Sequence, residues 1–263
     1  MDHTEPKIQI QAAVSVRNLS ITPDSKVTVV EQGALPVLCK LIKSGDLRLV
    51  EQAAIIFRNL SVNAENKIKI MATEGAKALV DLLKPLTKAD ESLDADTKAL
   101  KVKIQEQSAG VLRNLSMHND NKVPLNAFTF FFVPHFIFFP QVKLMNLSSV
   151  IACAKLLKGT SDPRVLEQAC GILRNLSTNN MAAGQICNEG AVEATTALLK
   201  NEDAKVVEQA AGTLRNVSAN KDLRAAIVQA GALPLLIDLL SHVDEKVQEQ
   251  AGVALRNLSD TVK

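Results

Sequence analysis

An Arg-Asn-Leu-Ser tetrapeptide recurs along the chain and limits the folds that are open to it. It occurs five times, beginning at Arg17, Arg58, Arg113, Arg174 and Arg256, with a conservative sixth copy, Arg-Asn-Val-Ser, at 215–218. The intervals from one arginine to the next are 41, 55, 61, 41 and 41. A base period of 41 with two longer intervals predicts a repeat array that carries two insertions. Such arrays grow by stacking, because each repeat buries its apolar face against its neighbours.

Each interval of the base period predicts three helices. In the last interval we expect Asn220 to begin a short helix and Gly231 to end it. Pro234 lies in the first turn of a second helix, where its missing N–H is tolerated. Asp244 caps a third and longest helix over 245–259. The sequence thus predicts an all-α array, with a lone third helix at 6–20 and repeats at 21–61, 62–116, 117–177, 178–218 and 219–259.

The third helix has one apolar face and one polar face. Ala210, Leu214 and Val217 recur at i, i+4 and i+7, which is the spacing of a buried stripe. Gln209 and Asn216 are seven residues apart and share another face. We expect Gly212, which lies between them, to leave that polar face uncovered.

The first insertion, at 85–97, is rich in Lys, Asp and Glu. This composition predicts a solvated loop, and a regulatory or partner-binding role is the alternative. Residues 98–104 are expected to extend the following third helix backwards.

The second insertion, at 123–141, holds seven of the eight phenylalanines of the chain. Removing it restores the repeat, with Val142 in place of Val123. A valine codon begins with GT, as introns do, and Gln141 can be encoded by CAG, with which introns end. The run of Phe and Pro between them is what a pyrimidine-rich tract encodes. We therefore interpret the segment as a translated intron. A genuine Phe-rich docking loop is the rival interpretation, whereas a membrane span is disfavoured because prolines interrupt a short stretch.

Composition excludes several classes of function. The net charge is +2 and the chain has no Tyr or Trp, so we expect neither nucleic-acid binding nor direct membrane insertion. Cys39, Cys153, Cys170 and Cys187 are scattered, which indicates reduced thiols in a cytoplasmic protein, with the nucleus as a second compartment. Phosphate-binding, nucleophile-elbow and metal-ligand motifs are absent from the sequence. We therefore predict no enzyme activity, no cofactor and no metal site.

These features together resemble the armadillo/β-catenin-like repeat superfamily. The resemblance rests on three helices per repeat, on Gly-Ala-Leu-Pro before the second helix, and on Glu-Gln-Ala followed by Leu-Arg-Asn-Leu-Ser in the third. It implies a right-handed superhelical solenoid whose third helices line a concave groove for extended partner segments. In that family an Asn near the end of the third helix bonds the partner's backbone. The matching residues here are Asn18, Asn59, Asn114, Asn175, Asn216 and Asn257.

A glutamine stands seven residues before five of these asparagines and shares their helix face. A ladder of amides offers donors and acceptors to a peptide backbone without requiring a particular side-chain sequence. The candidate partner-binding glutamines are Gln52, Gln107, Gln168, Gln209 and Gln250.

The arginines of the tetrapeptide resemble the basic groove of β-catenin-like proteins, which implies acidic partners. The candidates are Arg58, Arg113, Arg174, Arg215 and Arg256. In the alternative, each Arg pairs with the Glu seven residues earlier on its own helix, as Glu208 and Arg215 could, so that part of the positive charge is neutralised.

The resemblance implies a non-catalytic scaffold for protein–protein interaction. A substrate-recruiting or regulatory module of an enzyme complex, such as a ubiquitin ligase, is the alternative. A nuclear-transport adaptor is disfavoured, because importin-like repeats carry a Trp one turn before the Asn and this chain has none. The array begins and ends on third helices without polar caps, which predicts a truncated chain, end-to-end self-association or a partner that covers an end.

Overall fold

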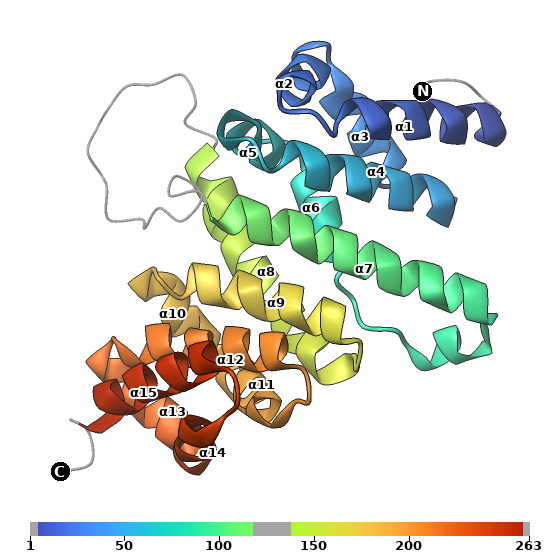
Figure 1. The fold of residues 1–263 in the computed structure, drawn as a ribbon. Helices are drawn as coiled ribbons and strands as arrows, with labels where there is room; N and C mark the ends of the chain where they lie inside the picture. The colour runs from blue at the N-terminus through green and yellow to red at the C-terminus, as the bar shows by residue number, and fades with distance from the viewer. Residues whose placement is uncertain (1–4, 118–137, 260–263) are drawn as a thin grey trace, which may run out of the picture. The chain divides into compact units, whose positions relative to one another are not determined.

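The computed structural model describes residues 5–117 and 138–259, and every regular element in these two ranges is a helix (Figure 1). The chain divides into two compact units, Met1–Met145 and Asn146–Lys263. We describe each unit by itself. Within both units the long third helix of one repeat packs against the third helix of the next.

Unit 1 contains three third helices, α1, α4 and α7, and α4 packs against both of the others. Shorter helices connect them. The elements are α1 (Pro6–Leu19), α2 (Pro23–Glu31), α3 (Ala34–Leu41), α4 (Leu47–Leu60), α5 (Ala64–Met71), α6 (Glu74–Asp81), the 3-10 helix η1 (Lys88–Ser92) and α7 (Ala95–Ser116).

Unit 2 repeats this arrangement with the third helices α9, α12 and α15, and α12 packs against both of the others. The elements are α8 (Phe138–Gly159), which begins before the unit boundary, α9 (Pro163–Leu176), α10 (Asn180–Asn188), α11 (Ala191–Ala197), η3 (Leu198–Lys200), α12 (Ala204–Ser218), η4 (Lys221–Leu223), α13 (Arg224–Gln229), α14 (Ala232–Asp238), η5 (Leu239–Ser241) and α15 (Glu245–Ser259).

The start and stop signals of the helices are confirmed. The side chains of Asp46, Asp203 and Asp244 accept the backbone N–H two residues further on, at 2.9, 2.8 and 2.9 Å, and so cap α4, α12 and α15. Gly33, Gly190 and Gly231 each end a first helix with φ of 80°, 70° and 75°, a left-handed conformation that favours glycine. These signals fix where each third helix begins and therefore which of its side chains share a face.

The predicted apolar stripe forms the core of each unit. Ala210, Leu214 and Val217 are fully buried, as are Phe57 and Leu60 at the matching positions of α4. In the described ranges no single helix has both the length and the apolar character of a membrane span. One pair does when taken together, Lys221–Gln229 with Ala232–Ser241, and it is bent by 86°.

The Phe-rich insertion at 123–141 lies mostly outside the described residues. Its described part, from residue 138 onward, is the first turn of α8. That helix continues to Gly159 without a break, whereas the uninterrupted repeats divide the same region into a first and a second helix.

The polar insertion at 85–97 is more ordered than the expected loop. The side chain of Asp90 accepts from the backbone and the hydroxyl of Thr87 at 2.7 and 2.8 Å, and it pairs with Lys101 of α7. Helix α7 begins at Ala95, so the last three residues of the predicted loop are helical. The reason is that Asp94 caps the helix through the N–H of Thr97, at 2.8 Å.

The Lys101 ammonium and the Thr87 donors hold the pKa of Asp90 at about 2, against an ordinary value of 3.8. A lowered carboxyl pKa favours the folded loop at pH above 3.8, and this contribution is lost as the pH falls through about 2. We expect Lys101→Gln to move the Asp90 pKa up toward 3.8, as followed by NMR titration of the side-chain carboxyl. An unchanged midpoint would show that the ion pair does not form in solution. Asp96, which lies in the first turn of α7, serves as the internal control.

Candidate functional site

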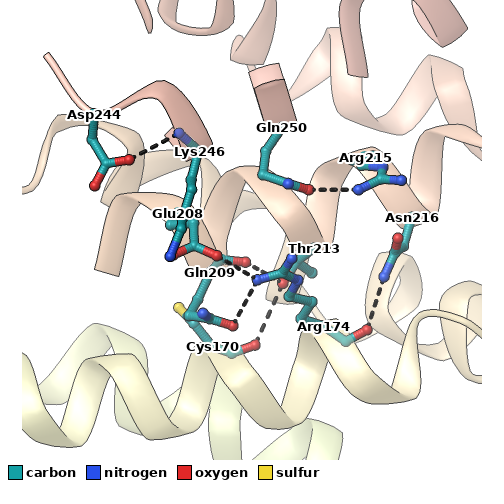
Figure 2. Close-up of polar contacts among 10 residues, drawn as sticks. All are labelled: Cys170, Arg174, Glu208, Gln209, Thr213, Arg215, Asn216, Asp244, Lys246 and Gln250. Atoms are coloured by element: carbon teal, nitrogen blue, oxygen red, sulfur yellow. Dashed lines mark hydrogen bonds and ion pairs between the residues drawn. The ribbon is translucent and has the colours of Figure 1, made fainter. Parts of the chain in front are cut away.

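The predicted site residues lie on the third helices, and the same set of contacts recurs wherever two third helices pack within a unit. We call each such pair a junction. The four junctions are α1 with α4, α4 with α7, α9 with α12, and α12 with α15. Figure 2 shows contacts of the last two.

At every junction an arginine from the earlier helix reaches forward to a glutamine of the later one. Its Nη1 donates to the glutamine Oε1 at 2.9 to 3.2 Å. Gln52, Gln209 and Gln250 are buried and Gln107 is half-buried, so each guanidinium supplies the hydrogen bond that a buried amide oxygen requires. The pairs are Arg17–Gln52, Arg58–Gln107, Arg174–Gln209 and Arg215–Gln250.

Two of these arginines also form ion pairs across the junction. Arg174 Nη1 lies 3.0 Å from Glu208 Oε1, and Arg58 Nη1 lies 3.6 Å from Glu106 Oε1. For these two arginines the observed partner is therefore not the one that the alternative interpretation gave, the Glu seven residues earlier on the same helix. The carboxylate belongs to the next third helix, which lies alongside and brings its Glu within reach of the guanidinium.

Gly212 does not leave the polar face uncovered, as the sequence suggested, because Arg174 of the preceding helix lies against it. A Cβ at Gly212 would stand 2.6 Å from Arg174 Nε, and one at Gly110 would stand 2.8 Å from Arg58 Nε. Glycine at these two positions therefore makes room for a neighbour's guanidinium.

The asparagines reach in the opposite direction, to the end of the preceding third helix. Asn59 and Asn114 donate through Nδ2 to the hydroxyls of Ser20 and Ser61, at 2.9 and 3.0 Å. In unit 2, Asn216 donates to a backbone carbonyl, and Asn257 donates to both a backbone carbonyl and a serine hydroxyl. These bonds are Asn216–Arg174 O at 2.9 Å, Asn257–Arg215 O at 3.3 Å and Asn257–Ser218 Oγ at 3.1 Å.

Each junction is thus held by a forward Arg–Gln bond and a backward Asn bond, which we call the reciprocal clamp. All four clamping asparagines are half-buried. Their bonds use N–H groups and leave the side-chain oxygens to accept from a partner.

The remaining predicted residues lie at the ends of the two sets of third helices. Asn18 on α1 and Arg256 on α15 are exposed. Arg113 on α7 and the pair Gln168 and Asn175 on α9 are half-buried.

The third helices also carry a second row of side chains, all basic, that was not among the predicted site residues. A basic residue stands 11 positions before each candidate Asn, and all six are exposed. Eleven residues at about 100° each return to within about 20° of the starting direction, so this residue shares the face of the Asn. The constant spacing of 11 residues between the basic residue and the Asn could have revealed this row in the sequence. It is easily overlooked because some positions hold Lys and others Arg. It consists of Lys7, Arg48, Lys103, Arg164, Lys205 and Lys246, which we call the basic row.

Comparison with known proteins identifies the repeats. The family model described as Armadillo/beta-catenin-like repeat matches residues 22–62, 179–219 and 220–260. A search of curated proteins finds no match.

Several solved structures have the same fold. An engineered protein is 25% identical with a TM-score of 0.79, over 98% of this chain and 93% of its own. A designed armadillo repeat protein in complex with the peptide (KR)4 is 20% identical with a TM-score of 0.76, over 97% of this chain and 95% of its own. A chain from a study of the interaction between cadherin and β-catenin is 20% identical with a TM-score of 0.75, over 98% of this chain and 46% of its own. With these matches the all-α solenoid expected from the tetrapeptide is confirmed, and the three matched stretches are armadillo/β-catenin-like repeats.

Proposed function

We propose that this chain is a non-catalytic scaffold that binds extended segments of partner proteins along its third helices. The observation that carries the proposal is the repetition of one amide at the end of successive third helices, each bonded through Nδ2 to the end of the preceding third helix. A designed armadillo repeat protein of the same fold is known in complex with a peptide, which supports this type of ligand.

The reciprocal clamp explains how the amides would work. Because Nδ2 of Asn59 or Asn114 is bonded to a serine of the preceding helix, the orientation of the amide is set before any partner arrives. The free Oδ1 then accepts a backbone N–H of the partner, and the second amide hydrogen donates to a backbone carbonyl. Pre-orientation reduces the entropy lost on binding. A row of such amides selects extended backbone over any particular side-chain sequence.

The clamp arginines have a structural role in this proposal. Arg58 and Arg174 are ion-paired with Glu106 and Glu208, so their charge is largely balanced within the junction. We therefore assign to them the alignment of neighbouring helices rather than the attraction of an acidic partner.

The test separates binding from the stability of the junction. Asn59→Ala and Asn114→Ala remove the amides. Ser20→Ala and Ser61→Ala keep the amides and remove the hydroxyls that these amides bond, which also donate to the carbonyls of Arg17 and Arg58. One lost hydrogen bond costs about 0.5–1.5 kcal/mol, so we expect each Asn variant to weaken binding by roughly two- to tenfold. The readout is titration calorimetry with a peptide selected from an array of extended sequences.

The serine variants are the matched controls. They keep the amides and lose only their pre-orientation, so we expect them to lower the unfolding temperature as the Asn variants do but to weaken peptide binding less. Equal binding by the Asn variants and the unmodified chain would refute the scaffold model.

A further inference from the structure

We propose that two copies of this chain associate end to end, with α15 of one copy packing against α1 of the other through a further reciprocal clamp. This inference goes beyond the proposed peptide binding and does not depend on it. It rests on two faces that match the two halves of the clamp, one on α1 in unit 1 and one on α15 in unit 2.

Helix α1 carries the receiving half of the clamp. Gln11 occupies on α1 the position of Gln52 on α4, and Asn18 follows it by seven residues, on the same helix face. At the junction of α1 with α4, Gln52 accepts from an arginine and Asn59 donates to a serine, both of the preceding third helix. On α1 the two amides are exposed, and among the described residues neither forms a side-chain hydrogen bond. This face of α1 can therefore receive another third helix.

Helix α15 carries the donating half. Arg256 occupies on α15 the position of Arg215 on α12, and Ser259 occupies that of Ser218. The Ser259 hydroxyl donates to the carbonyl of Arg256 at 2.8 Å, as the Ser218 hydroxyl does one repeat earlier. That bond uses the hydroxyl hydrogen and leaves the oxygen to accept, and Ser218 accepts in this way from Asn257 at 3.1 Å. Arg256 and Ser259 are both exposed, and in the part of the chain that the structure describes the Arg256 guanidinium has no partner.

Apolar side chains on both helices are exposed at positions that are buried elsewhere. Ile8 and Leu19 on α1 are 45% and 57% exposed. The matching pairs on the other third helices are at most 3% exposed, and they are Leu49 with Leu60, Ile104 with Leu115, Val165 with Leu176, Val206 with Val217, and Val247 with Leu258. On α15, Leu255 is half-buried, whereas Leu214 at the same position of α12 is fully buried. A third helix packed on either face would remove part of this apolar surface from water.

A second copy of the chain fits because each face supplies what the other lacks. Arg256 Nη1 would donate to Gln11 Oε1, which is the atom pair that joins Arg215 to Gln250 within unit 2. Asn18 Nδ2 would donate to Ser259 Oγ, as Asn257 does to Ser218. Two α1 faces would oppose amides without an arginine, and two α15 faces would oppose like charges. The contact is therefore head to tail, and an added copy leaves a free face at each end of the assembly.

The proposed contact is smaller than the junctions within the chain. It consists of third helices alone, whereas inside unit 1 the second helices α3 and α6 also pack against each other. Interfaces below about 1,000 Å² are typically weak. We therefore expect association that depends on concentration between roughly 10 μM and 1 mM.

The test uses the full chain and two variants, each of which removes one half of the clamp. Gln11→Ala with Asn18→Ala alters the α1 face, and Arg256→Ala with Ser259→Ala alters the α15 face. All four residues are exposed, so we expect both variants to fold, which circular dichroism verifies. Sedimentation velocity across the same concentration range measures the average mass.

We expect the mass of the unmodified chain to rise with concentration above the 28.4 kDa of the monomer. Loss of two hydrogen bonds lowers the association constant roughly five- to hundredfold, so each half-clamp variant should stay monomeric. An equimolar mixture of the two variants should form dimers, because α15 of one variant and α1 of the other are intact. A matched control, Gln32→Ala with Asn188→Ala, removes exposed amides outside the third helices and should associate like the unmodified chain.

Four results would overturn the inference. The first is a mass of 28.4 kDa at every concentration. The second is association that persists in both half-clamp variants, and the third is a mixture of the variants that stays monomeric. The fourth is equal loss of association in the control. None of these results bears on peptide binding at Asn59 and Asn114, which calorimetry tests separately.

Discussion

Gly75→Ala is expected to destabilise unit 1 by about 1–2 kcal/mol through overpacking, although alanine is the better helix former. A Cβ at Gly75 in α6 would stand 2.8 Å from Phe57 Cζ and 2.9 Å from Cys39 Sγ. The Phe57 ring is fully buried and has no solvent to move into, so the added methyl strains the core. Chemical denaturation followed by circular dichroism measures the change. Gly252→Ala is the control: its Cβ meets nothing closer than 3.7 Å, and it should stabilise by about 0.5–1 kcal/mol.

A double-mutant cycle identifies the cause. Phe57→Leu removes the ring atom that the new methyl would meet, and by itself should cost about 1–2 kcal/mol. In that background Gly75→Ala fills vacated space, so the double variant should be more stable than the sum of the single effects by about 0.5–2 kcal/mol. Strict additivity would mean that the two positions do not compete for the same volume.

Removal of clamp arginines should produce a graded series of stability losses. Arg174→Ala loses the bonds to Glu208 and Gln209 and should cost about 1–2 kcal/mol, because the side chain is 26% exposed and solvent screens part of the ion pair. Arg215→Ala loses a bond to a neutral amide, Gln250, and should cost about 0.5–1.5 kcal/mol. Arg256, which is exposed at the end of α15, is the control, and its change to Ala should lie within about 0.5 kcal/mol of zero.

The same clamp predicts that the effect of Gly212→Ala on stability changes sign when Arg174 is removed. With Arg174 present, Gly212→Ala displaces the guanidinium from its partners and should not stabilise the chain. In the Arg174→Ala background the three atoms nearest to the new methyl are gone, so Gly212→Ala should stabilise by about 0.5–1 kcal/mol. Thermal unfolding of the four proteins tests this, and an equal effect of Gly212→Ala in both backgrounds would show that Arg174 does not lie over the glycine.

Features that depend on one helix at a time could be predicted from the sequence. The caps Asp203 and Asp244 and the stop Gly231 act over one turn, and Ala210, Leu214 and Val217 share a face by periodicity alone. All of these lie where the pattern placed them.

The direction of the arginine contacts could not be predicted, because it depends on how two helices align. Glu208 precedes Arg215 by two turns of its own helix and follows Arg174 of the preceding repeat, so both pairings match the same repeated motif. Only the packing of α9 on α12 decides between them, and it selects Arg174. The covering of Gly212 has the same origin, since the side chain that fills the space comes from another repeat. Whether the asparagines and glutamines contact a partner remains a prediction.

The reciprocal clamp also bears on how an array of this kind can change its length during evolution. Each junction takes an Arg and an accepting Ser or carbonyl from one repeat, and a Gln and an Asn from the next. A tandem duplication of 178–218 would therefore place Arg215 of the first copy opposite Gln209 of the second, and Asn216 of the second copy opposite Ser218 of the first. Unequal crossing-over at this boundary adds or removes one whole repeat and leaves each new junction with an Arg, a Gln and an Asn in the positions that form the reciprocal clamp.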